Sequence, residues 1–390
     1  MNNVRADLNE RCSGCGLCES VCPKNAITVI HKNGFFRPEI SEDCIECGKC
    51  INHCPGYQKG KLVSYKCFKN VLYGHSTNEF IRKEAASGGL TTELLKYMLD
   101  NDVVDKVVTA GIYHNDKNLG YTVIDKNSAS DLYKHSGSNY CPANLGRAIK
   151  EIKQEEGRYA IVCLPCLARG INSLKKKDGI LARRIRYVIT LLCNHVPSYE
   201  ATDYLIKKYK VGVSGMIKYR GNGWFGHFRA FDKPENGMEI FSVPFTEYFP
   251  TKFSEYFWQK SCVSCNDHFG VDADACMGDA DFVKYHSDEN NDGETIVFSN
   301  NDEIITLIDG MHQKGILGIE KDVSDDDLEW IYGPISVANR ASDINTRTGY
   351  KDILRQEQRE KKIADIKAVL NIPKRLLHKI IRELKKYESE

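Results

Sequence analysis

The chain has 390 residues, which is enough for two or three domains with a full hydrophobic core. Its 54 Lys and Arg residues are balanced by 53 Asp and Glu residues, so no strong net charge attracts nucleic acid and we expect no nucleic-acid partner. The opening residues, MNNVRADLNER, lack the apolar core of a signal peptide, and the longest apolar stretches are too short to span a membrane. Sixteen cysteines would suggest secretion only if they paired, but half of them lie in motifs described below that do not suit disulfides, so we expect a reducing, cytoplasmic setting.

The first 58 residues contain one cysteine motif twice. RCSGCGLCESVCPKN (11–25) and DCIECGKCINHCPGY (43–57) share the spacing C-x2-C-x2-C-x3-C-P. Bacterial ferredoxins use this spacing, and in them three cysteines of a motif bind one 4Fe–4S cluster while the fourth binds the cluster of the other motif. We therefore predict a 2 × 4Fe–4S module in residues 1–58. One cluster is assigned to Cys12, Cys15, Cys18 and Cys54, and the other to Cys44, Cys47, Cys50 and Cys22.

Two other uses of these cysteines are weaker. Structural zinc also uses C-x2-C pairs, but two pairs do not explain a third close cysteine, an x3 fourth and a following proline in both motifs. Disulfides between cysteines this close would close loops too short to restrain the unfolded chain much. Iron–sulfur ligation is the prediction that explains the whole motif.

Beyond the module, strands are predicted to alternate with helices. A strand at 26–30 with a return to residue 40 belongs to the module, and a polar linker with few buried contacts is expected at 59–75. Further strands are predicted at 70–76, 105–114, 159–165, 185–193, 215–220, 228–233 and 295–300, and helices at 91–100, 143–157, 167–177, 199–210 and 302–315. This alternation predicts an α/β domain over residues 76–340.

Residues 341–390 are predicted to form a helical, basic C-terminal tail. Its stretch KRLLHKIIRELKKY sets Leu376, Leu377, Ile380, Ile381 and Leu384 on one helix face and basic residues elsewhere. Such a helix can rest on an anionic membrane or a partner. Packing against its own protein, with a solvated basic face, is the favoured interpretation.

Eight cysteines lie outside the repeated motif. They are Cys67, Cys141, Cys163, Cys166, Cys193, Cys262, Cys265 and Cys276. Cys166 and Cys193 follow predicted strands, and the carboxyl ends of neighbouring strands converge in open α/β sheets. Together with the C-x2-C pair Cys262 and Cys265, they indicate a further metal site, although any single one of them also fits a buried core cysteine.

At this point the sequence resembles a known family. The phrases AASGGLTTELLKYML, HSGSNYCPANLG, CLPCLARGINSL, LLCNHVPS and KSCVSCNDHFGVDADACMGDAD follow, in order, the motifs of the coenzyme F420 hydrogenase/dehydrogenase beta-subunit family. The resemblance runs over most of residues 1–285. It implies an iron–sulfur flavoprotein that binds FAD and passes electrons between 4Fe–4S clusters and a hydride carrier or organic substrate. Coenzyme F420 is one such carrier, and related proteins encoded beside polysaccharide-assembly enzymes occur in organisms without it.

The resemblance also implies ligands for a third cluster. Its four cysteines match Cys166, Cys193, Cys262 and Cys265. The chain departs from the family pattern in two places, because an extra Cys163 precedes the phrase LPC and Cys276 stands where the family usually has serine. Both therefore stay open as alternate ligands.

Two polar segments are the candidates for FAD binding under this resemblance. Ser87, Gly88 and Gly89 precede a predicted helix, whose N-terminal N–H groups can face a phosphate; an ordinary loop is the alternative. The second segment offers Lys134, Ser136, Ser138, Asn139 and Tyr140, for which the alternative is a solvated turn. Arg220 and Trp224 suit the lining of a planar cofactor, although Trp224 fits a core position equally well.

The leading hypothesis is an FAD- and 4Fe–4S-dependent oxidoreductase with no assigned acid or base residue. Its expected partners are a ferredoxin or another redox protein and a small-molecule substrate or hydride carrier. The alternative is an electron-transfer subunit without a substrate of its own. Direct NAD binding is disfavoured because no G-x-G-x-x-G opens a βαβ unit.

Overall fold

The computed structural model describes residues 2–4, 11–58, 64–212, 215–235, 237–248, 257–263, 265–281, 292–329 and 332. All the described residues belong to one compact unit. The predicted basic tail lies outside the described residues. Among the residues described, no helix combines the length and the apolar character needed to cross a membrane.

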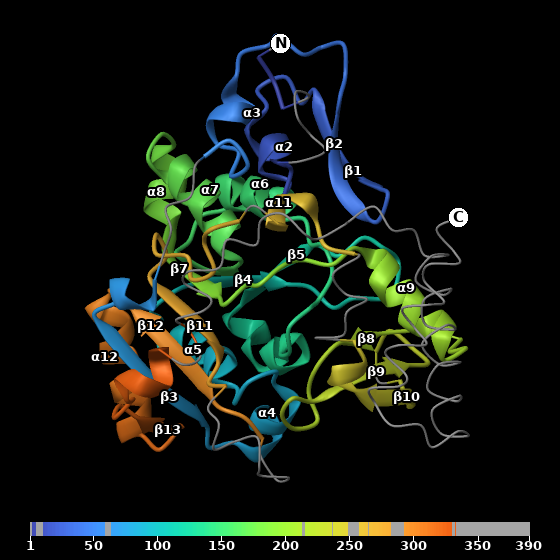
Figure 1. Ribbon diagram of the computed structural model, residues 1–390. Helices are drawn as coiled ribbons and strands as arrows, with labels where there is room; N and C mark the ends of the chain where they lie inside the picture. The colour runs from blue at the N-terminus through green and yellow to red at the C-terminus, as the bar shows by residue number, and fades with distance from the viewer. Residues whose placement is uncertain are drawn as a thin grey trace, which may run out of the picture. The chain divides into compact units, whose positions relative to one another are not determined.

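The N-terminal module is a small α+β unit, as the repeated motif predicted (Figure 1). Its elements are α2 (Leu17–Val21), β1 (Ile27–Lys32), β2 (Phe35–Ile40) and α3 (Lys49–Asn52). The two strands pair antiparallel, from Ile27 opposite Ile40 to Lys32 opposite Phe35. Asn33 and Gly34 connect them, both with positive φ (52° and 78°), which is the backbone that an Asn-Gly hairpin turn requires.

The second domain is built on an eight-stranded mixed sheet. Its order is β13-β3-β12-β11-β7-β6-β4-β5. The strands are β3 (Asn70–Ser76), β4 (Lys106–Ala110), β5 (Tyr121–Asp125), β6 (Tyr159–Cys163), β7 (Ile185–Leu191), β11 (Ala275–Asp279), β12 (Thr295–Ser299) and β13 (Leu317–Glu320). The central strands β4, β6, β7 and β11 run parallel, and antiparallel strands flank them on both sides.

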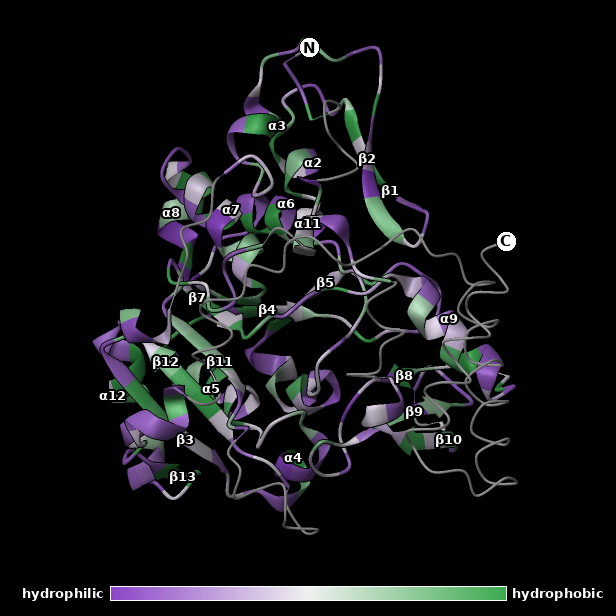
Figure 2. Ribbon diagram, viewed as in Figure 1, coloured by the Kyte–Doolittle hydropathy of each residue, from purple (hydrophilic) through white to green (hydrophobic). Residues whose placement is uncertain are grey.

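Helices cover both faces of this sheet. The helices of the domain are α4 (Glu79–Glu84), α5 (Leu90–Asp100), α6 (Gly146–Gln154), α7 (Pro165–Lys175), α8 (Gly179–Arg184), α9 (Tyr199–Lys208), α11 (Lys260–Val263) and α12 (Asp302–Gln313). On one face, α5 and α12 pack on Ala160 and Val162 of β6; on the other, α6 and α7 pack on Ile161. Because alternate residues of β6 serve the two faces, the whole strand is buried and hydrophobic. Figure 2 shows this hydrophobic character along β4, β11 and β12.

A small antiparallel sheet lies beside α9 (Figure 1). It consists of β8 (Ile217–Lys218), β9 (His227–Phe231) and β10 (Glu239–Pro244), in the order β10-β9-β8. Its inner side is aromatic, since the rings of Tyr219, Phe228 and Tyr248 contact one another with centroids 5.4 to 5.9 Å apart. Short 3-10 turns span Tyr65–Cys67, Lys126–His135 and Phe245–Glu247.

The predicted strands and helices are confirmed, with two corrections. β3 begins at Asn70, so the sheet starts inside the stretch 59–75 that was expected to be a linker. Residues 275–279, which the cysteine pattern singled out, form the buried strand β11. β5, β10 and β13 were not predicted either, because an edge or amphipathic strand of four to six residues has little hydrophobic signal of its own.

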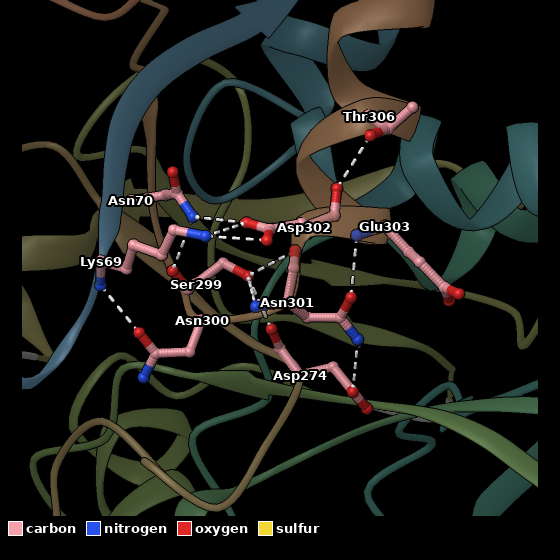
Figure 3. A network of polar contacts seen from close by, with 9 residues as sticks. All are labelled: Lys69, Asn70, Asp274, Ser299, Asn300, Asn301, Asp302, Glu303 and Thr306. Atoms are coloured by element: carbon pink, nitrogen blue, oxygen red, sulfur yellow. Dashed lines mark hydrogen bonds and ion pairs between the residues drawn. The ribbon is translucent and has the colours of Figure 1, made fainter.

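A polar network joins α12 to the sheet (Figure 3). Asn301 caps the helix, because its side-chain oxygen accepts from the N–H of Glu303 at 2.9 Å. Its amide donates to Asp274 at 2.7 Å, and Asp274 in turn accepts from the N–H of Val188 at 2.7 Å. Asp302 binds Lys69 at 2.7 Å, just before β3. These bonds align the start of β11 with β7 and so help to place the end of β11 at the site described below.

The module packs closely against the second domain through backbone and buried side chains. This corrects the expectation of few buried contacts between the two. The N–H of Leu145 donates to the carbonyl oxygen of Cys15 at 3.0 Å, and Leu17 is 1% exposed in the same cluster as Ile149 and Ile171. Two glycines allow the close approach: a Cβ at Gly146 would overlap the carbonyl oxygen of Gly16, and one at Gly170 would overlap Leu17. A chain cut near residue 60 would therefore expose part of the core.

Because of this contact, adding one methyl group at Gly146 should destabilise the protein. Gly146→Ala should lower the free energy of unfolding by about 1–3 kcal/mol, because the rigid Gly16 carbonyl cannot move aside freely. Limited proteolysis should also release the module faster. Gly310→Ala is the control: it lies in α12 with only the Tyr97 hydroxyl near, at 3.8 Å, and should be neutral or stabilising. Equal melting temperatures for the two variants would contradict the interlock.

Candidate functional site: a cavity between cysteines and polar loops

A cavity of about 860 Å³ lies at the carboxyl edge of the parallel strands. The last residues of β4, β6, β7 and β11 all line it: Ala110, Cys163, Leu191 and Asp279. Open α/β sheets place ligands at this edge, because the loops that follow parallel strands gather there. The cavity extends to the N-terminal module, which contributes Arg11, Ser13 and Gly56 to its lining.

One wall of the cavity carries the four cysteines predicted to hold the third cluster. Cys166 is the second residue of α7, which follows β6. Cys193 follows β7, and Cys262 and Cys265 lie in and just after α11. Burial raises the pKa of Cys166, and the nearby thiols of Cys265, Cys193 and Cys262 raise it further, so the four side chains share one site. His268 fixes the wall, because its Nδ1 lies 2.8 Å from the carbonyl oxygen of Cys193 and its own carbonyl accepts from the Cys193 N–H at 3.0 Å.

The first N-terminal set is also brought together. Burial raises the pKa of Cys18, with further increases from Cys15, Cys12 and Cys54, which are the other members of the set. Burial raises the pKa of Cys54 to about 11 and that of Cys15 to about 12. Without a cluster these thiols are protonated near neutral pH, so cluster binding must displace their protons.

The second N-terminal set lies at the surface of the module. Cys47 is exposed, and its neighbour Ile45 is 58% exposed, whereas Cys50 is buried. Backbone N–H groups approach the sulfurs in both sets, from Gly14 to Cys12 at 3.4 Å and from Ala26 to Cys22 at 3.3 Å. Among the described residues, no three His, Cys, Asp or Glu side chains converge closely enough for a single metal ion.

The two cysteines left open as alternate ligands have different places. Cys276 is fully buried in β11, among Phe269, Ile296 and Phe298, and packs in the core. Cys163 lines the cavity at the end of β6 but also belongs to the core with Ile161 and Val188. Burial raises its pKa, and no other thiol contributes to that shift. Burial raises the pKa of Tyr121, and Cys163, Cys166 and Cys193 raise it further, so Cys163 lies near the set and stays open as an alternate ligand.

Six of the eight residues predicted to bind FAD line the cavity. They are Ser87, Gly89, Ser136, Ser138, Asn139 and Tyr140. Gly88 instead packs behind the loop, where a Cβ would lie 2.8 Å from Cα of Glu294. Lys134 is exposed and pairs with Asp131 at 2.9 Å. Gly88 and Lys134 do not line the cavity, and their roles in FAD binding stay predictions.

Residues of β11 and β12 connect the loop before α5 to Arg220 at one end of the cavity. Thr295 donates to the carbonyl oxygen of Ser87 and stands opposite Asp279 in the β11–β12 ladder. Asp279 accepts from Arg220 Nη1 at 2.7 Å and from Trp224 Nε1 at 3.2 Å. Arg220 lines the cavity, as predicted for a cofactor site, and Trp224 contacts Asp279 beside it. The backbone at Gly137 packs against Arg220, with its Cβ position 3.4 Å from the Arg220 carbonyl oxygen.

Sequence reasoning missed several polar residues of this lining. Asp279, His268 and Asp267 lie in the stretch 260–281, where only the cysteines were predicted to have a role. Arg169 also lines the cavity and donates to Asp267 at 3.3 Å and to the carbonyl oxygen of Gln58 at 3.2 Å, so it bridges the cysteine wall and the module. The sequence signal for Arg169 was weak. Arg169 stands three residues after Cys166, and this spacing puts the two on one helix face only if both lie in a helix, as they do in α7.

Comparison with known proteins agrees with this architecture. The family models for the N-terminal and C-terminal parts of the coenzyme F420 hydrogenase/dehydrogenase beta subunit match residues 71–150 and 156–325. The chain belongs to the coenzyme F420 hydrogenase/dehydrogenase beta-subunit family. Residues 11–58 match the 4Fe-4S dicluster domain, which confirms the iron–sulfur module and makes zinc the wrong interpretation there. The family is one of oxidoreductases, so the chain has a redox role.

Three curated relatives carry names from this family. A subunit of the F(420)H(2) dehydrogenase of Methanosarcina mazei is 25% identical over 283 residues, which cover 68% of this chain and 75% of the relative. Coenzyme F420-dependent sulfite reductase of Methanocaldococcus jannaschii is 26% identical over 53% of this chain and 34% of its own length. The beta subunit of F420-dependent formate dehydrogenase 1 of Methanococcus maripaludis is 30% identical over 38% of each chain. The chain thus spans about a third of the length of the last two relatives.

A solved structure shares the fold. A chain of the F420-reducing [NiFe] hydrogenase complex from Methanosarcina barkeri superposes with a TM-score of 0.52 at 16% identity, over 73% of this chain and 93% of that one. At this identity the likeness concerns the fold alone.

The cysteine wall predicts a specific loss of iron. Protein purified without oxygen should contain about twelve iron atoms, and Cys265→Ser should lower this to about eight, because one four-iron cluster loses a ligand. Iron and sulfide analysis measures both. Cys276→Ala is the control and should keep its iron, since Cys276 packs in the core. Loss of four iron atoms from the control variant and none from Cys265→Ser would contradict the ligand set.

Proposed function

We propose that this chain is an FAD-binding iron–sulfur oxidoreductase subunit that connects a one-electron protein partner to a two-electron carrier. The observation that carries the proposal is the cavity itself, which has four cysteines on one wall and the N-terminus of α5 with the 136–140 loop on another. Iron–sulfur clusters transfer single electrons, and a flavin exchanges either single electrons or a hydride, so one site with both can connect the two kinds of donor. The carrier is of the coenzyme F420 type or a small organic substrate.

The cavity fits FAD in size and in its donor groups. Its volume of about 860 Å³ lies within the roughly 300–1,000 Å³ of typical ligand pockets. The first internal bond of α5 runs from Glu93 to the Gly89 carbonyl, so the N–H groups of residues 90–92 face the N-terminal end. Gly89, Thr91 and Thr92 all line the cavity there. A helix end of this kind favours a phosphate, and Ser138 and Asn139 add side-chain hydrogen-bonding groups nearby.

The protein's own residues would hold the metal groups. The thiols of Cys166, Cys193, Cys262 and Cys265 would bind the third cluster beside the cavity. Gln259 and Ser261, next to that set, both donate to the carbonyl oxygen of Cys12 in the first N-terminal set. The first set is thus fixed against the third, while the second set, with exposed Cys47, faces outward. This arrangement suits a module that meets a redox partner such as a ferredoxin.

An electron-transfer subunit without its own substrate is the second candidate. The names of two relatives describe them as subunits, which favours a chain that works within a larger assembly. Turnover of a two-electron carrier by the isolated chain separates the candidates, since a purely relaying subunit would show none. A role in polysaccharide biosynthesis stays a prediction.

The first test concerns the flavin. Ser87→Asp places a carboxylate beside the start of α5, so it should weaken FAD binding by at least about tenfold through repulsion of the diphosphate. Ser87→Asn has nearly the same shape without the charge and should bind FAD almost as well as the natural chain. Equilibrium titration with FAD measures both. Equal affinity for the two variants would mean that the phosphates lie elsewhere.

The second test concerns electron entry. Cys47→Ala removes a ligand of the outward-facing set, so it should lower the iron content by about four atoms and slow reduction of the protein by a one-electron donor. Reduction by a two-electron donor should be unchanged. Cys67→Ala is the matched control, because Cys67 is also exposed and belongs to none of the three sets. Undiminished one-electron reduction in the iron-depleted Cys47→Ala protein would exclude entry through this set.

A further inference from the structure

Arg220 is a buried cation in the wall of the cavity. Its side chain is 3% exposed, and its guanidinium carbon lies 5.2 Å from the centroid of the Phe245 ring. Nε donates to the carbonyl oxygen of Phe225 at 2.9 Å, and Nη1 donates to Asp279 at 2.7 Å. In the part of the chain that the structure describes, the remaining nitrogen, Nη2, has no hydrogen-bond partner.

A buried guanidinium donor without a partner is unfavourable, because burial removes its water without replacing the hydrogen bond. Burial alone would lower the pKa of Arg220, but Asp279 and the Tyr140 hydroxyl more than offset this and raise it. The group is therefore a fixed positive charge, with the Phe245 ring beside it and two carbonyl or carboxylate acceptors that orient it. A missing acceptor at Nη2 is the one incomplete feature of an otherwise ordered side chain.

The surroundings indicate that the missing acceptor is negatively charged. Asp279 links Arg220 to the start of α5, because Thr295 faces Asp279 in the ladder and donates to the Ser87 carbonyl. The positive end of the α5 dipole and the Arg220 cation thus border the same part of the cavity. A planar guanidinium matches the oxygens of phosphate and carboxylate groups better than it matches a neutral acceptor.

We propose that Arg220 Nη2 binds an oxyanion, a phosphate or carboxylate, of the molecule that occupies the cavity, with Asp279 and Phe245 as its positioning residues. The inference rests on the proposed function, because it requires a ligand in this cavity. Two sources supply such a group: the phosphates of a flavin nucleotide, and the acidic groups of the two-electron carrier. The choice between them is made by experiment.

The experiment measures binding of FAD, FMN, riboflavin and coenzyme F420 to the full chain, purified without oxygen, by equilibrium titration. Arg220→Met should weaken the binding of at least one phosphate-bearing probe by tenfold or more. The affinity of Arg220→Lys should lie between those of the natural chain and Arg220→Met, since lysine keeps the charge and loses Nη2. If the oxyanion is the flavin phosphate, FAD and FMN weaken while riboflavin does not. If it belongs to the carrier, all three flavins bind normally and coenzyme F420 weakens.

Arg229→Met is the matched control for folding. Arg229 is 7% exposed and pairs with Glu84 at 2.7 Å in a comparable buried ion pair, but it does not line the cavity. An equal loss of binding in Arg229→Met would overturn the inference, as would unchanged binding of all four probes in Arg220→Met. Failure of the natural chain to bind any flavin or coenzyme F420 would overturn the proposed function together with the inference, so the two failures are distinguishable.

Discussion

The candidate site depends on one constraint, the common direction of β4, β6, β7 and β11. Because the four strands are parallel, their carboxyl ends meet at one edge and the segments that follow them are gathered there. Cys166 and Cys193 follow two neighbouring strands, and the Cys262–Cys265 loop is held against Cys193 through His268. The antiparallel strands β12 and β3 then place the other wall, since Thr295 of β12 contacts the loop before α5.

The N-terminal module is an integral part of this site. Its backbone contacts α6 closely enough to exclude a side chain at Gly146, and its Cys12 carbonyl accepts from residues beside the third cysteine set. A fixed separation matters for electron transfer, because the rate depends on how closely the redox groups are held. In the second cysteine set, Cys47 is exposed at the surface of the module.

The two walls of the cavity differ in their chemistry. The cysteine wall holds the Cys166 thiol, whose pKa is raised by burial and by the neighbouring thiols, so a metal that binds there displaces its proton. The polar wall holds a permanent cation, Arg220, and the positive end of α5. Tyr140 lies between the two walls. Its hydroxyl is 3.5 Å from Arg220 Nη1 on the polar wall. Burial raises the pKa of Tyr140, and Cys193 of the cysteine wall is close enough to raise it further. A ligand that spans the cavity would contact both walls.

The amino-acid sequence by itself determined the local features of this protein. The repeated spacing around Cys12 and Cys44 specifies the iron–sulfur module, because cluster ligation requires those residues at those intervals. The long amphipathic helices and the apolar strands β6 and β7 were predictable from their periodicity. Tertiary structure decided what depends on distance across the fold. Only the sheet order shows that Cys276 points into the core while Cys193 reaches the cavity, and only the packing of Gly88 against β12 turns it away from the site. The partnership of Arg220 with Asp279, 59 positions along the chain, likewise follows from the meeting of two sheets, which local sequence patterns do not encode.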